Sequence, residues 1–298
     1  MAIKTTWQQE LAHFLTDWAG ELTFLQPSEK TVIWQIPNKN LAIWAVSLGE
    51  NSTDLLKQNT DGQPRIIVWE DVWHSKKAVV QSRLRAVLGY THRIPARLTR
   101  AQRIDKPTLD DFLQKNHLQI TTNAKYKYGL FLPEKHFSKV KYEITNNNEA
   151  HSLNFLTSNS ALQTARAAPL NLLVAAASFS GGKTIVREGQ NYRSFELIRF
   201  CSLCDFTVVG GLDKLLQAFI YEHHPDDIMT YADRDWSDGA SYEKLGFERI
   251  ETTDSQQFWV NPHTYDRHYA DRLTAAEIAP DWVEIENTGS WKFLKKMK

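Results

Sequence analysis

The loop after residues 228–232 carries three consecutive charged side chains, Asp233, Arg234 and Asp235. Residues 228–232 are apolar and predict a buried strand, and open α/β sheets bind ligands just beyond the carboxyl ends of their strands. We therefore expect Asp233 and Asp235 to be catalytic, and Arg234 to help hold a substrate or a nucleic-acid base. An Asp–Arg ion-pair network that locks the loop is the alternative.

Glu70 and Asp71 form a second acidic pair, at the end of a predicted strand over residues 65–69. Carboxylates in this position can bind a divalent metal that activates water for phosphodiester hydrolysis. We therefore treat both as candidate catalytic residues, and expect Mg²⁺ only if further acids complete the site. The sequence itself does not present a complete set of metal ligands.

Residues 208–211, Val-Val-Gly-Gly, turn into a helical pattern with apolar side chains on one face. The unpaired N–H groups and the positive dipole end at such a helix start suit an anionic ligand. On the predicted strand before this turn, Glu196 and Arg199 lie three positions apart, so a regular strand would place them on opposite faces. Glu196 is a candidate catalytic base, and an ion pair with a buried partner is the alternative.

The elements that position these residues predict a mixed α/β fold. Helices are predicted over residues 7–22, 76–88 and 108–116, after residue 211, and around Tyr242. Strands are predicted over residues 31–37, 41–46, 65–69, 126–132, 170–179, 195–203, 228–232 and 258–260. The strand over residues 170–179 should pair with the strand over residues 195–203. We expect one unit over residues 1–94, a mixed-sheet unit over 95–262 with an insertion at 133–168, and a basic tail over 263–298.

Composition limits the class of protein. The 298 residues predict about two domains, and 42% hydrophobic residues exclude a disordered chain. A formal net charge of zero excludes a uniformly basic nucleic-acid binder, although it permits a local basic patch. Cys201 and Cys204 are too few for a disulfide scaffold or a zinc site. Because the sequence shows neither a signal peptide nor a membrane-spanning run, we expect a cytoplasmic protein without a membrane partner.

Residues 74–106 concentrate positive charge that is opposed locally by Asp105 alone. Such a field can hold phosphates. We predict nucleic-acid contacts from Lys76, Lys77, Arg83, Arg97, Arg100 and Arg103. A solvated helix face followed by a basic linker is the alternative.

Two segments resemble the Vsr-like homing endonucleases of phages, which are described by an EDxHD motif. The first is IIVWEDVWHSKKAVVQSRLRAVLG at residues 66–89, followed by IPARLTR and FLQKNHLQ. The second runs from ELIRFCSL through TVVGGLDKLL to YADRDWSDGASYEKLGF. The order and spacing match across most of residues 66–260. The resemblance implies DNA as a partner and an N-terminal nuclease unit of the PD-(D/E)xK kind.

That family would place acids on the two strands before residue 66 and a histidine after the second strand. In the register that the resemblance implies, Ile33 and Trp44 stand at the acidic positions and Asn51 at the histidine position. Ile33 and Trp44 cannot ligate a metal, so the resemblance implies a nuclease centre that has lost its ligands. Glu50 and Asp54 would substitute in a different register, which leaves an active Mg²⁺-dependent endonuclease as an alternative.

Residues 95–260 also resemble the GNAT acyltransferases, through LNLLVAAASF, the glycine turn and SYEKLGF. In that family the acyl-CoA pyrophosphate rests on backbone N–H groups of the turn. Carried over, the resemblance implies contacts from Val209, Gly210, Gly211 and Leu212, with Lys214 adding positive charge. It also implies that Tyr242 protonates the CoA thiolate, which a phenol can do at neutral pH.

The turn departs from the usual Arg/Gln-x-x-Gly-x-Gly/Ala pattern. Thr207 replaces the leading residue, and Asp213 adds a negative charge in the first helical turn that opposes a pyrophosphate. The DNA-modifying proteins of the Mom type also look GNAT-related, so the resemblance extends to base modification only by analogy.

Together these features predict a phage- or mobile-element-type DNA-associated protein related to homing endonucleases. Its nuclease centre would be degenerate, and its GNAT-like unit would bind a small ligand or a nucleic-acid base. The alternatives are an acyl- or base-modifying transferase with an acyl-CoA-like donor, an active endonuclease, and a non-enzymatic DNA-binding or assembly protein.

Overall fold

A computed structural model of the chain describes residues 6–50, 64–119, 123–140, 171–187 and 189–297. These residues form two compact units. Unit 1 contains the chain up to residue 84 and residues 230–295, and unit 2 contains residues 85–229 and 296–298. Residues 230–262 therefore belong with the N-terminal segment, whereas the sequence-based ranges grouped them with the second unit. Within the described ranges, no helix is both long and apolar enough to cross a membrane.

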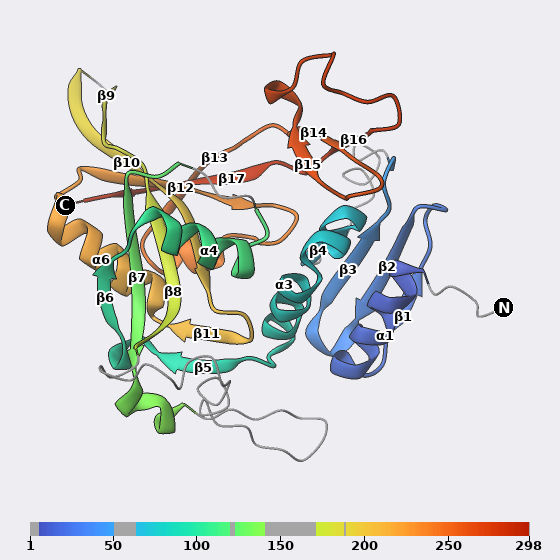
Figure 1. The fold of residues 1–298 in the computed structure, drawn as a ribbon, viewed down its shortest axis with the longest axis horizontal. Coiled ribbons are helices and arrows are strands. Elements are labelled where there is room, and N and C mark those ends of the chain that lie inside the picture. The colour runs from blue at the N-terminus through green and yellow to red at the C-terminus, as the bar shows by residue number, and fades with distance from the viewer. Residues whose placement is uncertain (1–5, 51–63, 120–122, 141–170, 188, 298) are drawn as a thin grey trace. The chain divides into compact units, whose positions relative to one another are not determined.

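Unit 1 contains a four-stranded sheet in the order β1-β2-β3-β4, drawn in blue in Figure 1. Its strands are β1 (Thr23–Leu25), β2 (Thr31–Ile36), β3 (Leu41–Val46) and β4 (Arg65–Trp69), with the 3₁₀ turn η1 (Pro37–Lys39) between β2 and β3. β1, β2 and β3 pair antiparallel, and β4 runs parallel to β3. Helix α1 (Trp7–Ala19) packs against β2, and Thr6 begins it with a capping box.

The helix after β4 begins earlier than its pattern predicted. α3 (Glu70–Leu88) starts directly at the end of β4, instead of at residue 76. Lys76 lies at φ −133° and ψ 30°, outside helical geometry, and divides the helix. The sequence pattern located the second part only, because the periodic apolar positions lie after the break.

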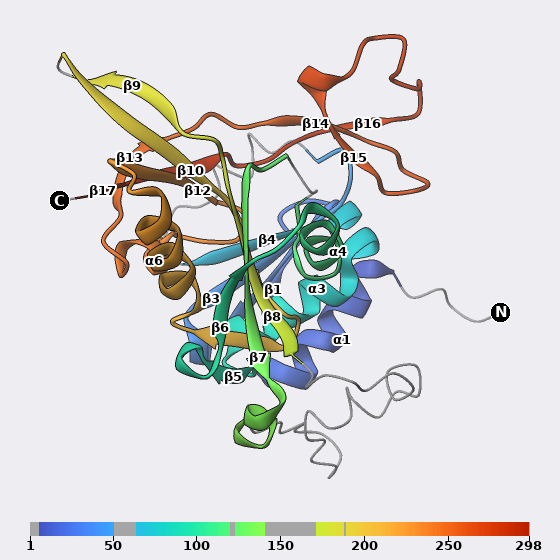
Figure 2. The same ribbon diagram turned by 60° about the vertical axis from the view of Figure 1, so that its left-hand side comes forward.

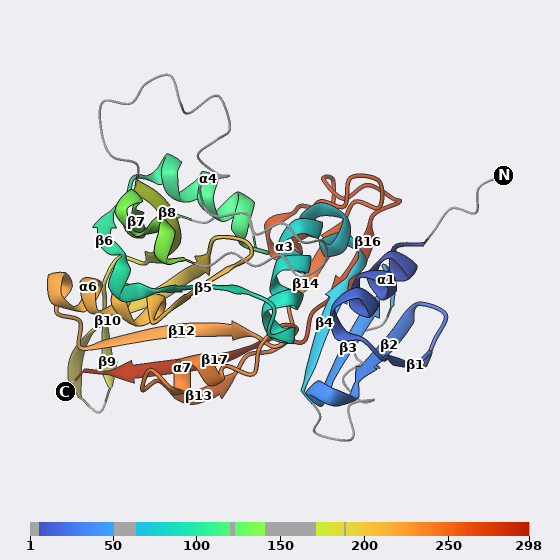
Figure 3. The ribbon, with the colours of Figure 1, turned by 90° about the horizontal axis from the view of Figure 1, so that it is seen from below.

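The C-terminal segment of unit 1 is folded, so the prediction of a basic tail over residues 263–298 was wrong. β15 (Arg267–Tyr269), β14 (Gln257–Val260) and β16 (Val283–Glu286) form a three-stranded sheet in that order, with η4 (Ala270–Arg272) after β15. β17 (Ser290–Lys296) pairs with β13 (Glu248–Thr252), beside the short helix α7 (Ala240–Glu243) (Figure 3). Ile285 and Phe293 are buried, and burial of such side chains stabilises the segment despite the lysines on either side of Phe293.

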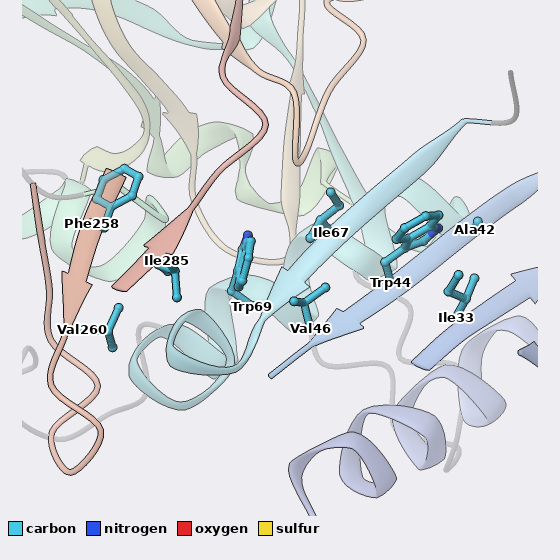
Figure 4. Close-up of a cluster of buried hydrophobic side chains, with 9 residues drawn as sticks. All are labelled: Ile33, Ala42, Trp44, Val46, Ile67, Trp69, Phe258, Val260 and Ile285. Atoms are coloured by element: carbon cyan, nitrogen blue, oxygen red, sulfur yellow. The ribbon is translucent and has the colours of Figure 1, made fainter. Parts of the chain in front are cut away.

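One apolar core joins the two sheets of unit 1. Figure 4 shows its buried side chains, which come from β2, β3, β4, β14 and β16. The members are Ile33, Ala42, Trp44, Val46, Ile67, Trp69, Phe258, Val260 and Ile285. The face of β2–β4 that carries Ile33 and Trp44 is thus part of a core and not an open surface.

Unit 2 contains an antiparallel series of strands in the order β10-β8-β7-β6. The strands are β6 (Arg100–Arg103), β7 (Tyr126–Pro133), β8 (Asn171–Phe179) and β10 (Gln190–Ser202), and β9 (Lys183–Arg187) pairs with the start of β10. The predicted pairing of β8 with β10 is confirmed. β5 (His92–Pro95) and β11 (Phe206–Val209) form a separate parallel pair. The remaining element, β12 (Asp227–Asp233), contains the point at which the two units divide.

Two helices cover opposite faces of the β6–β10 strands (Figure 2). α4 (Lys106–Asn116) packs against β7, β8 and β10, and α6 (Gly211–His223) packs against β6, β7 and β8. The cap of α4 is Asp105, whose carboxylate accepts from the N–H of Thr108, so the helix begins two residues before the predicted start at residue 108. Short 3₁₀ turns lie at η2 (Ala96–Leu98) and η3 (Glu134–Lys139). The predicted insertion continues beyond η3 into residues 141–168, which lie outside the described residues.

The predicted mixed α/β class is confirmed in this form, with several sheets and helices on them. Residues 51–63 are not described, so Asn51 and Asp54 lie outside the described residues.

Candidate functional site

Asp235, in the loop after β12, is a buried carboxylate of unit 1 that accepts from three donors. It is 2% exposed. Its Oδ2 accepts from Trp69 Nε1 at 2.9 Å, and its Oδ1 accepts from the N–H and the hydroxyl of Thr288 at 3.1 and 2.6 Å. Its backbone carbonyl accepts from the N–H of Ile67 at 2.7 Å. Buried carboxylates need such donors, so this aspartate fixes the loop to β4 and to the segment before β17.

Asp71, in the first turn of α3, is held by an arginine from β15. Arg267 donates from Nε to Oδ2 and from Nη2 to Oδ1 of Asp71, both at 2.7 Å. Asp71 is 1% exposed and the Arg267 side chain 19%. The pair is therefore a buried, two-pronged ion pair, in which both carboxylate oxygens are occupied.

Arg267 also connects Asp71 to the aspartates of the 233–235 loop. Burial works against its charge, but Asp71, Asp235 and Asp233 outweigh burial and hold the pKa of Arg267 above its ordinary value. Three of the acids selected from the sequence thus surround one guanidinium. We call Asp71, Asp233, Asp235 and Arg267 the acid–arginine cluster.

Asp233 differs from the other acids of the cluster. Burial, and then the neighbouring charge of Asp235, raises the pKa of Asp233 to about 7, against the opposing effects of Arg267 and Arg83. Its Oδ1 accepts from the N–H of Asp235 at 3.0 Å. Asp233 therefore exchanges a proton near neutral pH, as a general acid or base must. The cluster is thus an ion-pair network whose cation is Arg267, and one of its acids has a raised pKa.

The two positions that the nuclease resemblance assigns to acids face each other in the sheet. Ile33 and Trp44 are register partners on β2 and β3, and Trp44 is the register partner of Ile67 on β4. Ile33 and Trp44 belong to the buried core of Figure 4, and their side chains are 8% and 5% exposed. Among the described residues, no group of three or more His, Cys, Asp or Glu side chains could hold a metal ion.

The other acids near β4 are engaged in local bonds. Glu70 accepts from the N–H of Leu48 at 3.0 Å, which ties the start of α3 to the end of β3. Glu50 accepts from the hydroxyls of Ser28 and Thr31. These contacts close loops of unit 1, and they give Glu70 and Glu50 structural roles.

The glycine turn has the backbone geometry that its sequence predicted. Gly210 lies at φ 76°, in the left-handed region that favours glycine, and precedes α6 as its N-cap. No side chain caps the helix. Val209 is 51% exposed and Gly210 is exposed, whereas Gly211 and Leu212 are buried. A Cβ on Gly211 would lie 2.9 Å from the Cβ of Val208, so that glycine is needed for close packing.

The charge of Lys214 is engaged by backbone carbonyl groups. Its ammonium group donates to the carbonyl oxygens of Ala96 and Thr99, at 2.9 and 2.5 Å. Burial lowers the pKa of Lys214. The sequence assigned this lysine to an anionic donor, but in the structure it joins α6 to the segment around η2.

Glu196 and Arg199 do not follow the alternation of a regular strand. The register of β10 against β8 shifts between Leu197 and Arg199, as in a β-bulge. An extra residue reverses the alternation after it, so the expectation of opposite faces was wrong. Burial raises the pKa of Glu196, and Arg199 and Lys183 act in the other direction. Glu196 thus has an interacting cation on its own strand.

The basic residues of the 74–106 segment separate into two groups. Four of them have acidic partners: Lys77 with Glu10, Arg85 with Asp205, Arg103 with Glu222, and Lys106 with Asp110. Arg93, Arg97 and Arg100 are exposed. Apart from Asp110, these acidic partners come from distant parts of the sequence. Counting charges within residues 74–106 therefore did not reveal them.

Three further predicted residues pack on aromatic rings or lie in the break of α3. The guanidinium of Arg83 lies 5.2 Å from the ring centre of Trp236, and that of Arg234 lies 4.6 Å from Trp291. Lys76, at the break of α3, is half-buried. Stacking of this kind uses the planar guanidinium as a packing surface.

Tyr242 lies in α7 of unit 1, and its ring packs against Phe247 and Phe293 at centroid distances of 5.7 and 5.5 Å. The glycine turn belongs to unit 2. Tyr242 and the glycine turn therefore belong to different units, and no contact within one unit supports the thiolate-protonating role that the GNAT resemblance implies for Tyr242.

Sequence reasoning missed a polar network at the end of α6. The hydroxyl of Tyr128 donates to Glu222 and lies 3.0 Å from Nε2 of His223, and Arg103 pairs with Glu222 at 2.5 Å. Burial, and then Glu222, raises the pKa of Tyr128. Burial lowers the pKa of His223, which is half-buried at the end of α6. Arg267 was missed for a different reason, because it lies in the segment taken as a tail.

Comparison with known proteins adds little to this description. No protein-family model matches the sequence, and no curated protein matches it. A solved structure of the NatC complex bound to Gag peptide and CoA matches with a TM-score of 0.32 and 9% identity. The match covers 67% of this chain and 99% of that chain. Similarity at this level assigns neither unit to a fold family.

Proposed function

We propose that this chain is a nucleic-acid-associated protein that does not cleave its target. Its N-terminal sheet would be a Vsr-like nuclease unit without its metal ligands, and unit 2 would be GNAT-like. The observation that carries the proposal is the pairing of Ile33 with Trp44 inside an apolar core, at the two positions where that nuclease resemblance requires acids.

The acid–arginine cluster supports the absence of cleavage. Asp71 would be the remaining metal ligand at the end of β4, but both its oxygens accept from Arg267. A guanidinium in that place repels a divalent cation and occupies its ligand. The Arg267 guanidinium therefore neutralises the buried acids, as a bound metal ion would otherwise do.

Two assays on the full chain test this proposal. We expect no Mg²⁺-dependent nicking of supercoiled plasmid, and binding of a duplex that weakens steeply between 50 and 200 mM salt, by about tenfold or more. Cleavage by the wild type that disappears in Asp71→Asn, with the fold retained by circular dichroism, would contradict the loss of nuclease activity. Binding that does not depend on salt would contradict a phosphate-based association.

A second candidate is an acyl- or base-modifying transferase whose acyl-CoA-like donor binds at the glycine turn. The left-handed Gly210 before an uncapped α6, beside the exposed Val209, favours it. Backbone N–H groups at such a helix start suit phosphate. Asp213 in the first turn and the engaged Lys214 reduce the positive charge that a pyrophosphate would meet.

Thermal denaturation with acetyl-CoA tests the second candidate. We expect stabilisation of the wild type and its loss in Val209→Glu, because a carboxylate at the turn repels the pyrophosphate. Val186→Glu on β9 is the matched control, since Val186 is also an exposed valine of unit 2. Gly211→Asp is less suitable, because a side chain there would collide with Val208 and weaken the fold. A wild type that acetyl-CoA does not stabilise removes this candidate.

A further inference from the structure

Basic residues that lack acidic partners gather around η2, β6 and η3 of unit 2. We call Arg97, Arg100, Lys135, His136 and Lys139 the basic face. Arg97, Arg100, Lys135 and Lys139 are exposed. In the part of the chain that the structure describes, none of these four cations makes an ion pair.

The strand pairing of unit 2 brings these residues to one end of the sheet. Arg100 begins β6 and is the register partner of Phe131, near the end of β7. β7 ends at Pro133, and η3 follows at once with Lys135, His136 and Lys139. η2, which carries Arg97, also packs against β7. Residues separated by more than thirty positions in the sequence thus share one region.

His136 reports how closely the charges gather. Burial lowers the pKa of His136, and Lys139, Lys135 and Arg100 lower it further. Three cations from two elements therefore act on one imidazole ring, and no acid acts in the opposite direction. Glu134 is the single acid of η3, and it is half-buried at the start of that turn.

Four other basic residues of the 74–106 segment contrast with this face. Lys77, Arg85, Arg103 and Lys106 are each neutralised by a carboxylate. The basic face therefore includes cations of η3, which the sequence pattern did not select, together with those of η2 and β6.

We propose that the basic face of unit 2 binds the phosphate backbone of a nucleic-acid duplex, without regard to its sequence. This inference rests on the proposed nucleic-acid association and states which surface carries it. Guanidinium and ammonium groups that are exposed and unpaired release counterions when they contact phosphates, which drives such binding. An anionic membrane fits less well, because none of the large exposed apolar side chains lies in η2, β6 or η3.

The test compares two triple variants that lose the same charge. In Arg100→Gln/Lys135→Gln/Lys139→Gln the basic face loses three cations. In Lys106→Gln/Lys115→Gln/Arg249→Gln the chain loses three exposed cations that are paired with Asp110, Asp111 and Glu243. Duplex affinity is measured from 50 to 200 mM salt by fluorescence anisotropy, with circular dichroism as the folding check. Vesicles of phosphatidylserine and phosphatidylcholine are the second probe.

We expect the first variant to bind duplex about 10- to 100-fold more weakly, and its salt slope to fall by up to about 0.9 for each phosphate that the variant no longer neutralises. The control variant should retain both affinity and slope. Equal losses in the two variants would overturn the inference, because net charge alone would then explain them. Unchanged binding by the first variant would overturn it and leave the proposed function standing. A wild type that binds vesicles but no duplex would overturn both.

Discussion

Removal of the Arg267 guanidinium is the most informative perturbation of unit 1. Arg267 lies between Asp71, which is 1% exposed, and the acids of the 233–235 loop. Arg267→Met keeps the length and much of the apolar stem, but leaves the Asp71 carboxylate without its two donors. Breaking one side of a buried ion pair in this way costs about 3–5 kcal/mol.

The assay is urea unfolding of four proteins, followed by tryptophan fluorescence because Trp69 contacts the cluster through Asp235. They are the wild type, Arg267→Met, Asp71→Asn and the double variant. Asp71→Asn should cost less than Arg267→Met, because Asp233 and Asp235 still compensate the arginine. The double variant should cost less than the sum of the single ones, with a coupling energy of about 1–3 kcal/mol.

Arg272→Met is the matched control, since Arg272 is exposed and stacks on Tyr269 near β15. Its cost should stay within about 0.5 kcal/mol. Two results would refute the reasoning: a cost for Arg267→Met within about 1 kcal/mol of that control, or a coupling energy near zero. Either would mean that Asp71 does not depend on the guanidinium, and Asp71 would again be a candidate metal ligand.

Three further predictions concern other parts of the same argument. Because the pKa of Asp233 is raised from 3.8 to about 7, its contribution to stability is present below pH 4 and is lost as the pH rises through 7. At about 1.4 kcal/mol per pKa unit, the free energy of unfolding of the wild type should fall by up to about 4 kcal/mol over this window. In urea unfolding, the stability of Asp233→Asn should depend less on pH than that of the wild type. The same pH dependence in both proteins would contradict the raised pKa. Trp44→Ala should destabilise unit 1 by about 3–5 kcal/mol in the same assay, whereas a cost below about 1 kcal/mol would mean that this face of the sheet is not a packed core. Tyr128→Phe should lower stability by about 0.5–1.5 kcal/mol, because the phenol donates to Glu222, and a thermal melt that shows no loss would remove this role.

Local pattern located most elements but not all of their boundaries. Strands β3 and β4 have the predicted bounds, since continuous apolar runs of that length are typical of buried strands. The start of α3 was missed because its first residues, from Glu70 to Ser75, have few periodic apolar positions before the break at Lys76. Strand β17 was missed because its lysines flank a short apolar pair, Phe293 and Leu294, and the sequence alone does not show that this pair is buried.

The candidate site shows a similar division between local and distant information. Asp71, Asp233 and Asp235 were identifiable because each follows an apolar strand. Their relation was not identifiable, since Arg267 lies 196 positions from Asp71 in the chain. No local pattern couples an acid to a cation at that distance.

The sequence by itself determined which residue types stand at strand ends, and it determined the conformation of the glycine turn. Gly210 has φ 76° because a residue without a Cβ can adopt that angle at little cost, which is a property of the residue alone. Only the tertiary structure decided which charges are compensated. Asp71 meets Arg267, Lys77 meets Glu10, and Lys135 and Lys139 gather with Arg100. Electrostatic energy depends on distance in space and on burial, and neither is set by order along the chain.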